Sequence, residues 1–192
     1  MNLLKLFYQC RNWRAHWRAL YLGSYSVIEG ALARALDGGA DRVTMRGEVA
    51  AKIIHADSSE LDLGCIGKRV VTTAGVNYMR DDFAAAAGAA DITNFKYHDS
   101  GTGAVAEAIG DTALGTAAGP ARVAGTQDNS VAKQYKTVAT IAYTATLAIT
   151  EHGIFSAATV GTLWDRTVFA AINVVNGDSI QFTYTLTIND GG

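Results

Sequence analysis

The stretch Ser179–Asn189, SIQFTYTLTIN, decides the fold class of this chain. Every odd-numbered position in it is polar, and the apolar positions are Ile180, Phe182, Tyr184, Leu186 and Ile188. Strict alternation with a period of two predicts a β-strand with one face on a core and the other face polar. Just upstream, Asn176-Gly177 separates this stretch from Ile172–Val175, and Asn-Gly is the preferred pair of a type I′ hairpin turn.

Two further segments extend the pattern toward the middle of the chain. Ile141–Ile149 alternates in the same way, and Leu163–Ala170 reads as another strand. Together they give at least four antiparallel strands between Lys136 and Asn189. Several short strands joined by turns predict a β-sandwich with jelly-roll-like features. We therefore expect a mainly β protein whose sandwich domain covers residues 41–192, with its clean strands from about 136 to 189.

The segment before that region predicts a mixture of elements. Arg42–Ile54 is expected to form one or two strands, Ser58–Gly64 a turn and Lys68–Thr72 a short strand. Thr73 is expected to cap a helix from Ala74 to about Ala87, with Gly88 as its stop signal. Val76, Met79 and Phe83 fall on one face of that helix.

The next segment is expected to be less regular. Ile92–Tyr97 predicts a half-buried strand because its side chains alternate. Ser100–Gln127 is rich in glycine, alanine and threonine and predicts a long loop with a short helical turn near Ala104–Ile109. A loop of that length usually has a purpose or lies against a partner.

The first 22 residues predict an amphipathic helix, within an N-terminal helical arm of residues 1–40. Its apolar face consists of Leu3, Leu6, Cys10, Trp13, Trp17 and Leu20. Such a helix must bury its tryptophans against the chain's own body, a neighbouring subunit or a membrane surface, and the acidic remainder of the chain argues against the membrane. We expect Leu6, Trp13, Trp17, Arg14 and Arg18 to form an assembly interface. Arg11 and Arg14 interrupt the apolar run, so neither a secretory signal nor a membrane span is expected.

The overall composition excludes some classes of function. Of the 192 residues, 49% are hydrophobic, which is enough for a sizeable core, and the net charge is −2. A nucleic-acid partner is not expected, because such proteins show a basic excess or stripe. Cys10 and Cys65 lack the spacing of a disulfide framework or a zinc site, and two separate thiols are compatible with a reducing cytoplasm.

No combination of residues predicts catalysis or metal binding. His98-Asp99-Ser100 holds the letters of a nucleophilic triad, but adjacent residues on an extended chain point to opposite faces. Glu151-His152-Gly153 is expected to be a turn at a strand end with hydrogen-bonded polar side chains. Gly101-Thr102-Gly103 lacks the lysine and hydroxyl of a phosphate loop. We therefore expect no enzyme, no catalytic residue, no cofactor and no metal.

Several longer motifs do have counterparts in a known family. They are G-T-G followed by D-T-A-L, I-T-E-x-G-I-F, G-T-L with R-x-V-F, and a closing G-D-S-I-Q-F-T-Y-T-L-T-I. In this chain they are Gly101–Gly103, Asp111–Leu114, Ile149–Phe155, Gly161–Phe169 and Gly177–Ile188. About the last hundred residues resemble small virion structural proteins of tailed bacteriophages, and Arg69–Phe83 extends the likeness.

This resemblance implies a virion building block assembled in the host cytoplasm. Our first hypothesis is a capsid decoration (cement) protein that binds the major capsid protein, as a homo-oligomer and preferably a trimer. The alternative is a neck, tail or fibre-adaptor protein. A third hypothesis is a carbohydrate-binding module that uses Tyr97, Trp164 or Tyr184 on an exposed sheet face. A hydrolase around His98 or His152 is the fourth.

Overall fold

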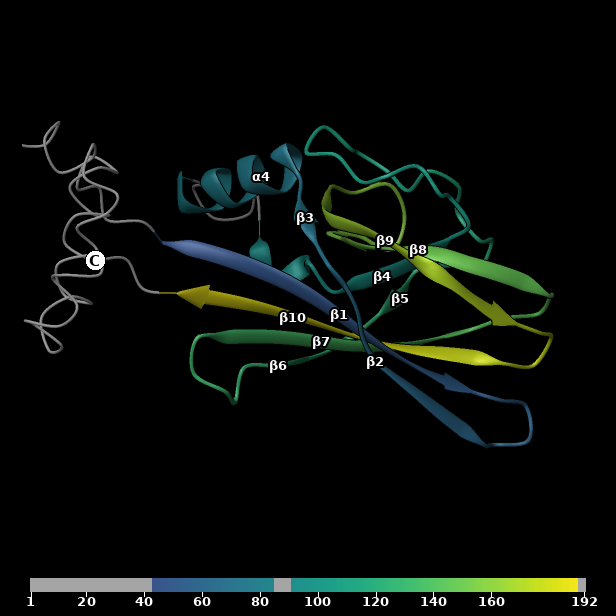
Figure 1. Ribbon diagram of the computed structural model, residues 1–192. Helices are drawn as coiled ribbons and strands as arrows, with labels where there is room; N and C mark the ends of the chain where they lie inside the picture. Colours follow the sequence, from purple (N-terminus) through teal and green to yellow (C-terminus); the bar gives the residue numbers. More distant parts are fainter. Residues whose placement is uncertain (1–42, 85–90, 190–192) are drawn as a thin grey trace, which may run out of the picture. The chain divides into compact units, whose positions relative to one another are not determined.

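Two five-stranded antiparallel sheets make up the described part of the chain, residues 43–84 and 91–189 of the computed structural model (Figure 1). They lie within one unit, Thr44–Asn189. The expectation of a mainly antiparallel β protein is therefore confirmed. The expected helix over residues 1–22, with Leu6, Trp13, Arg14, Trp17 and Arg18, lies outside the described residues.

The strands divide between the sheets as follows. In spatial order, sheet A contains β2 (Glu60–Lys68), β1 (Thr44–Ile54), β10 (Ser179–Asn189), β7 (Gln134–Ala142) and β6 (Thr126–Asp128). Sheet B contains β3 (Val70–Val71), β9 (Leu163–Val174), β8 (Leu147–Phe155), β4 (Tyr97–Gly101) and β5 (Val123–Ala124).

Strand β10 lies at the centre of sheet A, between β1 and β7. Its predicted alternation is confirmed as far as Leu186, since the apolar residues from Ile180 to Leu186 are buried while the polar residues between them are only half-buried. Ile188, at the end of the strand, is exposed. The main apolar cluster combines β10 side chains with Ile149 and Ile172 of sheet B. The two sheets thus share one core, formed by the faces that they turn toward each other.

The connections differ from the prediction at two places where the chain changes sheet. Ile141–Ile149 is not one strand, because the chain leaves sheet A after Ala142 and enters sheet B at Leu147. Asn176-Gly177 likewise links β9 of sheet B to β10 of sheet A, so it does not close a hairpin. Gly177 has a φ of +96° and Asn176 is not among the residues with positive φ, which fits a type II turn rather than type I′.

The first half of the described chain also departs from expectation. Arg42–Ile54 gives a single strand, β1, and the expected turn over Ser58–Gly64 is wrong because Glu60 already begins β2. The expected strand over Ile92–Tyr97 is wrong as well. Ile92–Asn94 is a short 3-10 helix, η2, since the Asp91 carboxylate accepts hydrogen bonds from the Thr93 N–H at 2.9 Å and the Thr93 hydroxyl at 2.5 Å. Such local bonds compete with a strand ladder.

The predicted helix is present as α4 (Thr73–Ala84), but its cap and its buried face differ. The hydroxyl of Thr72, not Thr73, accepts the Gly75 N–H at 3.0 Å. Gly75 is the buried residue, because a Cβ there would lie 2.7 Å from the Trp164 carbonyl oxygen. Of the expected apolar face, Met79 packs against the core cluster that contains Phe95 and Trp164, whereas Val76 and Phe83 are exposed. Gly88 lies outside the described residues, and none of the helices among the described residues is long and apolar enough to cross a membrane.

Truncation of Phe182 tests the shared core. Phe182 is fully buried in the cluster that joins both sheets. We expect Phe182→Ala to lower the free energy of unfolding by about 3–5 kcal/mol, because it removes apolar contacts and leaves a cavity. Denaturant unfolding measures this change. Thr183→Ala on the outer face of the same strand is the control, and equal losses for both variants would contradict the assignment of Phe182 to the core.

Candidate functional site

A chain of hydrogen-bonded polar side chains runs through the buried space between the sheets. His98 on β4 and His152 on β8 are both fully buried, and His98 Nδ1 lies 3.0 Å from His152 Nε2. His98 Nε2 lies 3.2 Å from the Thr137 hydroxyl on β7, while Arg69 Nη1 contacts His152 Nδ1. A guanidinium only donates, so His152 Nδ1 accepts and its Nε2–H must donate to His98, which in turn donates to Thr137. Every link is satisfied with both imidazoles neutral.

Arg69 ends this chain with a buried ion pair to Asp165. The same guanidinium donates to the carbonyl oxygens of Asp165 at 2.9 Å and His152 at 3.2 Å, and it lies 5.0 Å from the centre of the Tyr184 ring. Burial raises the pKa of the Asp165 carboxyl, and the positive charge of Arg69 opposes that rise. The Arg69 charge is therefore held by Asp165 and His152 of sheet B and by the Tyr184 ring of sheet A.

Burial also determines the protonation of the two histidines. Loss of hydration lowers the pKa of His98 to about 3, with a further contribution from the Arg69 charge. Burial lowers the pKa of His152 well below its ordinary value for the same reasons. Neither imidazole exchanges protons near neutral pH, so neither side chain is placed to act as a general base.

The three residues His98, Asp99 and Ser100 each contact a different partner. His98 contacts His152, whereas the Asp99 carboxylate accepts a bond from Arg122 Nε at 3.0 Å. The Ser100 hydroxyl lies 2.9 Å from the Tyr143 hydroxyl. These three residues therefore do not form a nucleophile, base and orienting acid.

A second buried charge, Glu151 on β8, fastens the long loop to sheet B. Its carboxylate accepts backbone N–H groups from Gly103 at 2.9 Å, Gly115 at 2.9 Å and Thr116 at 2.8 Å, and Arg166 Nε at 2.7 Å. Glu151 is fully buried. Three backbone donors and a guanidinium provide the ligands that a dry carboxylate requires.

Arg166 on β9 extends this arrangement into the loop. Its Nη1 donates to the Asp111 carboxylate at 2.8 Å and its Nη2 donates to the Val105 carbonyl oxygen at 3.0 Å. The expected helical turn at Ala104–Ile109 is absent, and the backbone there follows these contacts instead. The loop therefore lies on the protein's own sheet B.

The close approach of the Glu151 carboxylate explains why the G-T-G motif has glycine at both of its ends. A Cβ on Gly101 or on Gly103 would lie 2.4 Å from Glu151 Oε1. Only glycine lets the backbone approach the carboxylate this closely. Glu151-His152-Gly153, expected to be a turn at a strand end, instead lies inside β8, because the loop covers one face of the strand and sheet A covers the other.

A third contact joins the end of this loop to the turn between β8 and β9. The guanidinium of Arg122 stacks 3.4 Å from the centre of the Phe155 ring. It also donates to the carbonyl oxygens of Ala157, at 3.2 Å, and Val160. Val160 has a φ of +56°, which is unusual for a β-branched residue. The Arg122 contacts hold that strained turn in place.

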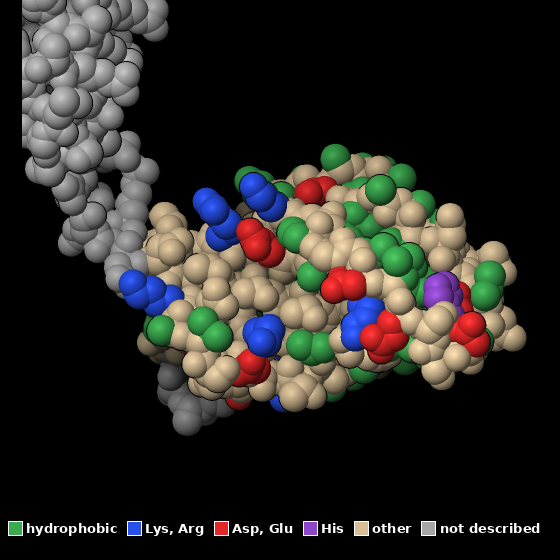
Figure 2. All heavy atoms as spheres, turned by 60° about the horizontal axis from the view of Figure 1, so that its bottom comes forward, with side chains coloured by type: hydrophobic (Ala, Val, Ile, Leu, Met, Phe, Trp, Pro, Cys, Tyr) green, Lys and Arg blue, Asp and Glu red, His purple; other side chains and the backbone are tan. Residues whose placement is uncertain are grey.

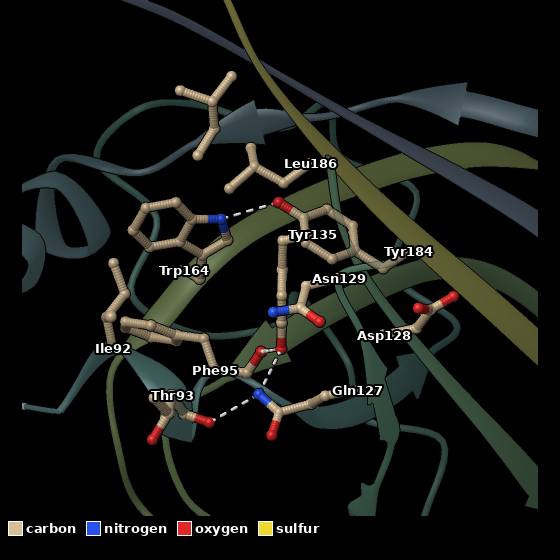
Figure 3. A pocket seen from close by; sticks show the side chains of 11 residues that line it. Ile92, Thr93, Phe95, Gln127, Asp128, Asn129, Tyr135, Trp164, Tyr184 and Leu186 are labelled. Carbon is tan, nitrogen blue, oxygen red and sulfur yellow. Dashed lines mark hydrogen bonds between the residues drawn. The ribbon is translucent and has the colours of Figure 1, made fainter. Parts of the chain in front are cut away.

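A pocket with a volume of about 430 Å³ lies between the sheets at their edge (Figure 3). Its walls carry four aromatic side chains, Phe95, Tyr135, Trp164 and Tyr184. Gln127 closes one side, since its amide Nε2 donates to the Thr93 carbonyl oxygen at 2.9 Å and to the Tyr135 hydroxyl at 2.8 Å. The pocket is thus apolar with an amide rim.

The aromatic platform that a sheet-face glycan module needs is not formed by the expected residues. Trp164 is 2% exposed and Tyr184 is 1% exposed, and the indole N–H donates to the Tyr184 hydroxyl at 2.8 Å. Tyr97 is half-buried and does not line the pocket. The prediction that Trp164 and Tyr184 lie on an exposed face is therefore wrong.

The outer surface seen from below Figure 1 carries mixed charges (Figure 2). Lys52 pairs with Glu60 at 2.9 Å, and Lys136 pairs with Asp128 at 2.8 Å. On this face basic side chains lie beside acidic ones and form no patch of one sign. Within residues 43–84 and 91–189, histidine, cysteine, aspartate and glutamate side chains form no group of three that could hold a metal ion. Cys65 is a free, exposed thiol.

Comparison with known proteins returned no match to a protein-family model, to a curated protein or to a solved structure. The resemblance of the motifs to phage virion proteins therefore stays a prediction.

The sequence contained a signal for the buried charges that our reading missed. Asp165 and Arg166 stand in the middle of an otherwise apolar strand, LWDRTVF. Charged residues in a strand buried on both faces need partners, so this pair indicates a second pair elsewhere. Glu151-His152 in ITEHGIF is that pair. Arg69 carried no comparable signal, because a lone arginine in a short strand is usually exposed.

The neutral histidines make stability depend on pH. In the unfolded chain both titrate near ~6.5, whereas in the folded protein their pKa values are lowered, to about 3 for His98. As the pH falls below ~6.5 the unfolded state gains protons that the folded state cannot bind, so stability falls. We expect a slope that corresponds to about two protons between roughly pH 5.5 and 4.5, because each histidine binds a proton only in the unfolded chain there.

Replacement of one histidine tests this prediction. His98→Gln should reduce the pH slope of the unfolding free energy from about two protons to about one. Thr183→Ala, on the outer face of β10, removes no titratable group, so this control should keep the two-proton slope. Urea unfolding across this pH range gives the slopes. An unchanged slope in the His98 variant would show that His98 is not held neutral.

Loss of the Glu151 charge should release the loop. Glu151→Gln places an N–H₂ group where donors converge, so we expect a destabilisation of about 3–5 kcal/mol, as for other broken buried ion pairs. Hydrogen exchange should also show lost protection at the amides of Gly103, Gly115 and Thr116. Glu107→Gln is the matched control, because Glu107 accepts only one weak bond, from the Val168 N–H at 3.3 Å. Retained protection of the three amides in the Glu151 variant would contradict the role of the carboxylate.

Proposed function

We propose that this chain is a non-enzymatic structural protein of a tailed-bacteriophage virion, and that it decorates the capsid as a cement protein. The observation that carries the proposal is the structural role of the residues in the motifs that resemble phage virion proteins. Gly101, Gly103, Glu151 and Arg166 belong to one buried assembly that fixes a loop on a sheet. Motif residues that hold a loop in place on a sheet favour a structural protein over an enzyme.

The remaining chemistry agrees with such a role. His98 and His152 are the buried titratable groups whose pKa values are lowered most. Both lie in the core, away from water, and both have fixed hydrogen-bond partners. The two sheets, in which the first strand β1 pairs with the last strand β10, supply the rigid body of a jelly-roll-like module. Its partners would be the major capsid protein and further copies of the chain, preferably as a trimer at local threefold positions.

Localisation in purified particles tests the proposal. Cryo-EM of the virion, with quantitative mass spectrometry of separated heads and tails, should find the chain on heads at a copy number that matches the capsid lattice. A single ring of copies at the neck or tail would favour the alternative, a neck, tail or fibre-adaptor protein. Absence from the particle would overturn the virion assignment altogether.

A glycan-binding module needs a different test. Titration with host polysaccharide should give no binding if the role is structural. Saturable binding that Trp164→Ala does not reduce would point to another surface.

The N-terminal segment supplies a prediction at residue level. Trp13→Ala and Trp17→Ala should reduce incorporation of the chain into particles, because tryptophans on an amphipathic segment act as interface anchors. The melting temperature should stay unchanged. Asn12→Ala, off the apolar face, is the control. A steep fall in melting temperature with normal incorporation would show instead that these tryptophans stabilise the chain's own fold.

A further inference from the structure

The turn between β9 and β10 contains a chemically reactive pair, Asn176-Gly177. Asn176 is the only asparagine of the chain that is followed by glycine. An asparagine side chain can cyclise onto the backbone nitrogen of the next residue, and glycine hinders that attack least because it has no Cβ. Both residues are exposed to solvent. The sequence and the exposure of this pair, taken alone, therefore predict rapid deamidation.

The nitrogen that would attack is hydrogen-bonded in the folded chain. The Gly177 N–H donates to the Tyr143 carbonyl oxygen at 2.9 Å, and Tyr143 is buried. The Gly177 nitrogen must lose its hydrogen when it attacks the Asn176 side chain, and the folded turn directs this hydrogen at a carbonyl oxygen. The attack therefore requires the turn to leave its folded position.

Further hydrogen bonds hold the turn in that position. The Asp178 N–H donates to the Val175 carbonyl oxygen at 3.1 Å, and the Tyr143 N–H donates to the Asp178 carbonyl oxygen at 2.9 Å. The buried Asp178 carboxylate accepts the N–H groups of Val175 at 3.0 Å and of Ala56 at 3.2 Å. Tyr143 and Ala56 belong to the β7–β8 and β1–β2 connections, so these bonds tie three connections together at one end of the sheets (Figure 1).

We propose that Asn176 is a deamidation site that folding closes and that opening of the β9–β10 turn exposes. In the open turn the Gly177 nitrogen forms a bond to Cγ of Asn176, the Cγ–Nδ2 bond breaks, and the hydrogen of the Gly177 nitrogen leaves with Nδ2 as ammonia. Water then adds to either carbonyl carbon of the succinimide. Cleavage of its Cγ–N bond gives aspartate, and cleavage of its backbone C–N bond gives isoaspartate.

The succinimide and isoaspartate products do not fit the folded turn. The succinimide nitrogen carries no hydrogen, so the Tyr143 carbonyl oxygen loses this donor, which costs free energy at a buried residue. Isoaspartate adds a carbon atom to the backbone between β9 and β10. A chain that reacts while its turn is open is therefore altered irreversibly, and the rate of reaction measures how often this end of the sheets opens. This inference does not depend on where the chain acts.

Deamidation of the full chain, folded and unfolded, tests the proposal. The chain is incubated at mildly alkaline pH in buffer and in urea, beside a peptide of sequence VVNGDSI, and mass spectrometry of peptide digests follows Asn176. We expect the chain in urea to react like the peptide, and the folded chain to react about tenfold more slowly or slower still, because the reaction waits for the turn to open. Hydrogen exchange of the Gly177 amide should be slowed by a similar factor. Equal rates in buffer and in urea, or a slow reaction together with an unprotected Gly177 amide, would overturn the proposal.

A variant tests the bonds that hold the turn closed. Asp178→Ala removes the acceptor of two of these bonds, so it should speed deamidation of the folded chain roughly tenfold relative to a peptide with the same substitution. Asp57→Ala is the matched control, because the Asp57 carboxylate accepts the Ser59 N–H at 2.9 Å within the neighbouring β1–β2 connection. Far-UV circular dichroism verifies that both variants fold, and the comparison of the unaltered chain in buffer and in urea needs neither of them. A folded Asp178 variant that reacts no faster than the unaltered chain would contradict the proposed closure of the site.

Discussion

The buried carboxylate of Glu151 is the constraint on which much of this structure depends. A carboxylate without water must be surrounded by donors, and β8 alone cannot provide them. The loop after β4 therefore returns three backbone N–H groups to it, and β9 adds Arg166. That requirement fixes glycine at Gly101 and Gly103 and lays the loop over sheet B. Burial of both faces of β8 follows from it.

Adjacent residues on two neighbouring strands serve the two faces of sheet B. On β8, Glu151 points to the loop and His152 points to the space between the sheets; on β9, Arg166 and Asp165 divide in the same way. Alternation along a strand makes this division automatic. The face toward the loop carries the Glu151–Arg166 ion pair, and the face toward sheet A carries the Asp165–Arg69 ion pair. Removal of Arg69 or of Asp165 would leave its buried ion-pair partner without the opposite charge.

The difference between what could and could not be predicted follows from solvent exposure. β10 was readable because one of its faces meets water, so its side chains alternate between apolar and threonine. β8 was not, because both of its faces are buried and the sequence ITEHGIF shows no period. The connection at Asn176-Gly177 was predicted wrongly because a local turn signal is the same in a hairpin and in a change of sheet. The pocket depends on residues from η2, β6, β7, β9 and β10, a long-range combination that no local pattern encodes.

Strongly shifted pKa values often mark active sites, but the surroundings decide what they mean. An active-site base has a lowered or raised pKa together with access to a substrate. His98 and His152 have the shift without the access, since each ring nitrogen is already bonded to Thr137, to Arg69 or to the other imidazole. The pocket has the opposite character, with access but with a lining in which the only carboxylate, Asp128, is paired with Lys136. The two neutral histidines are thus not among the residues that line this pocket.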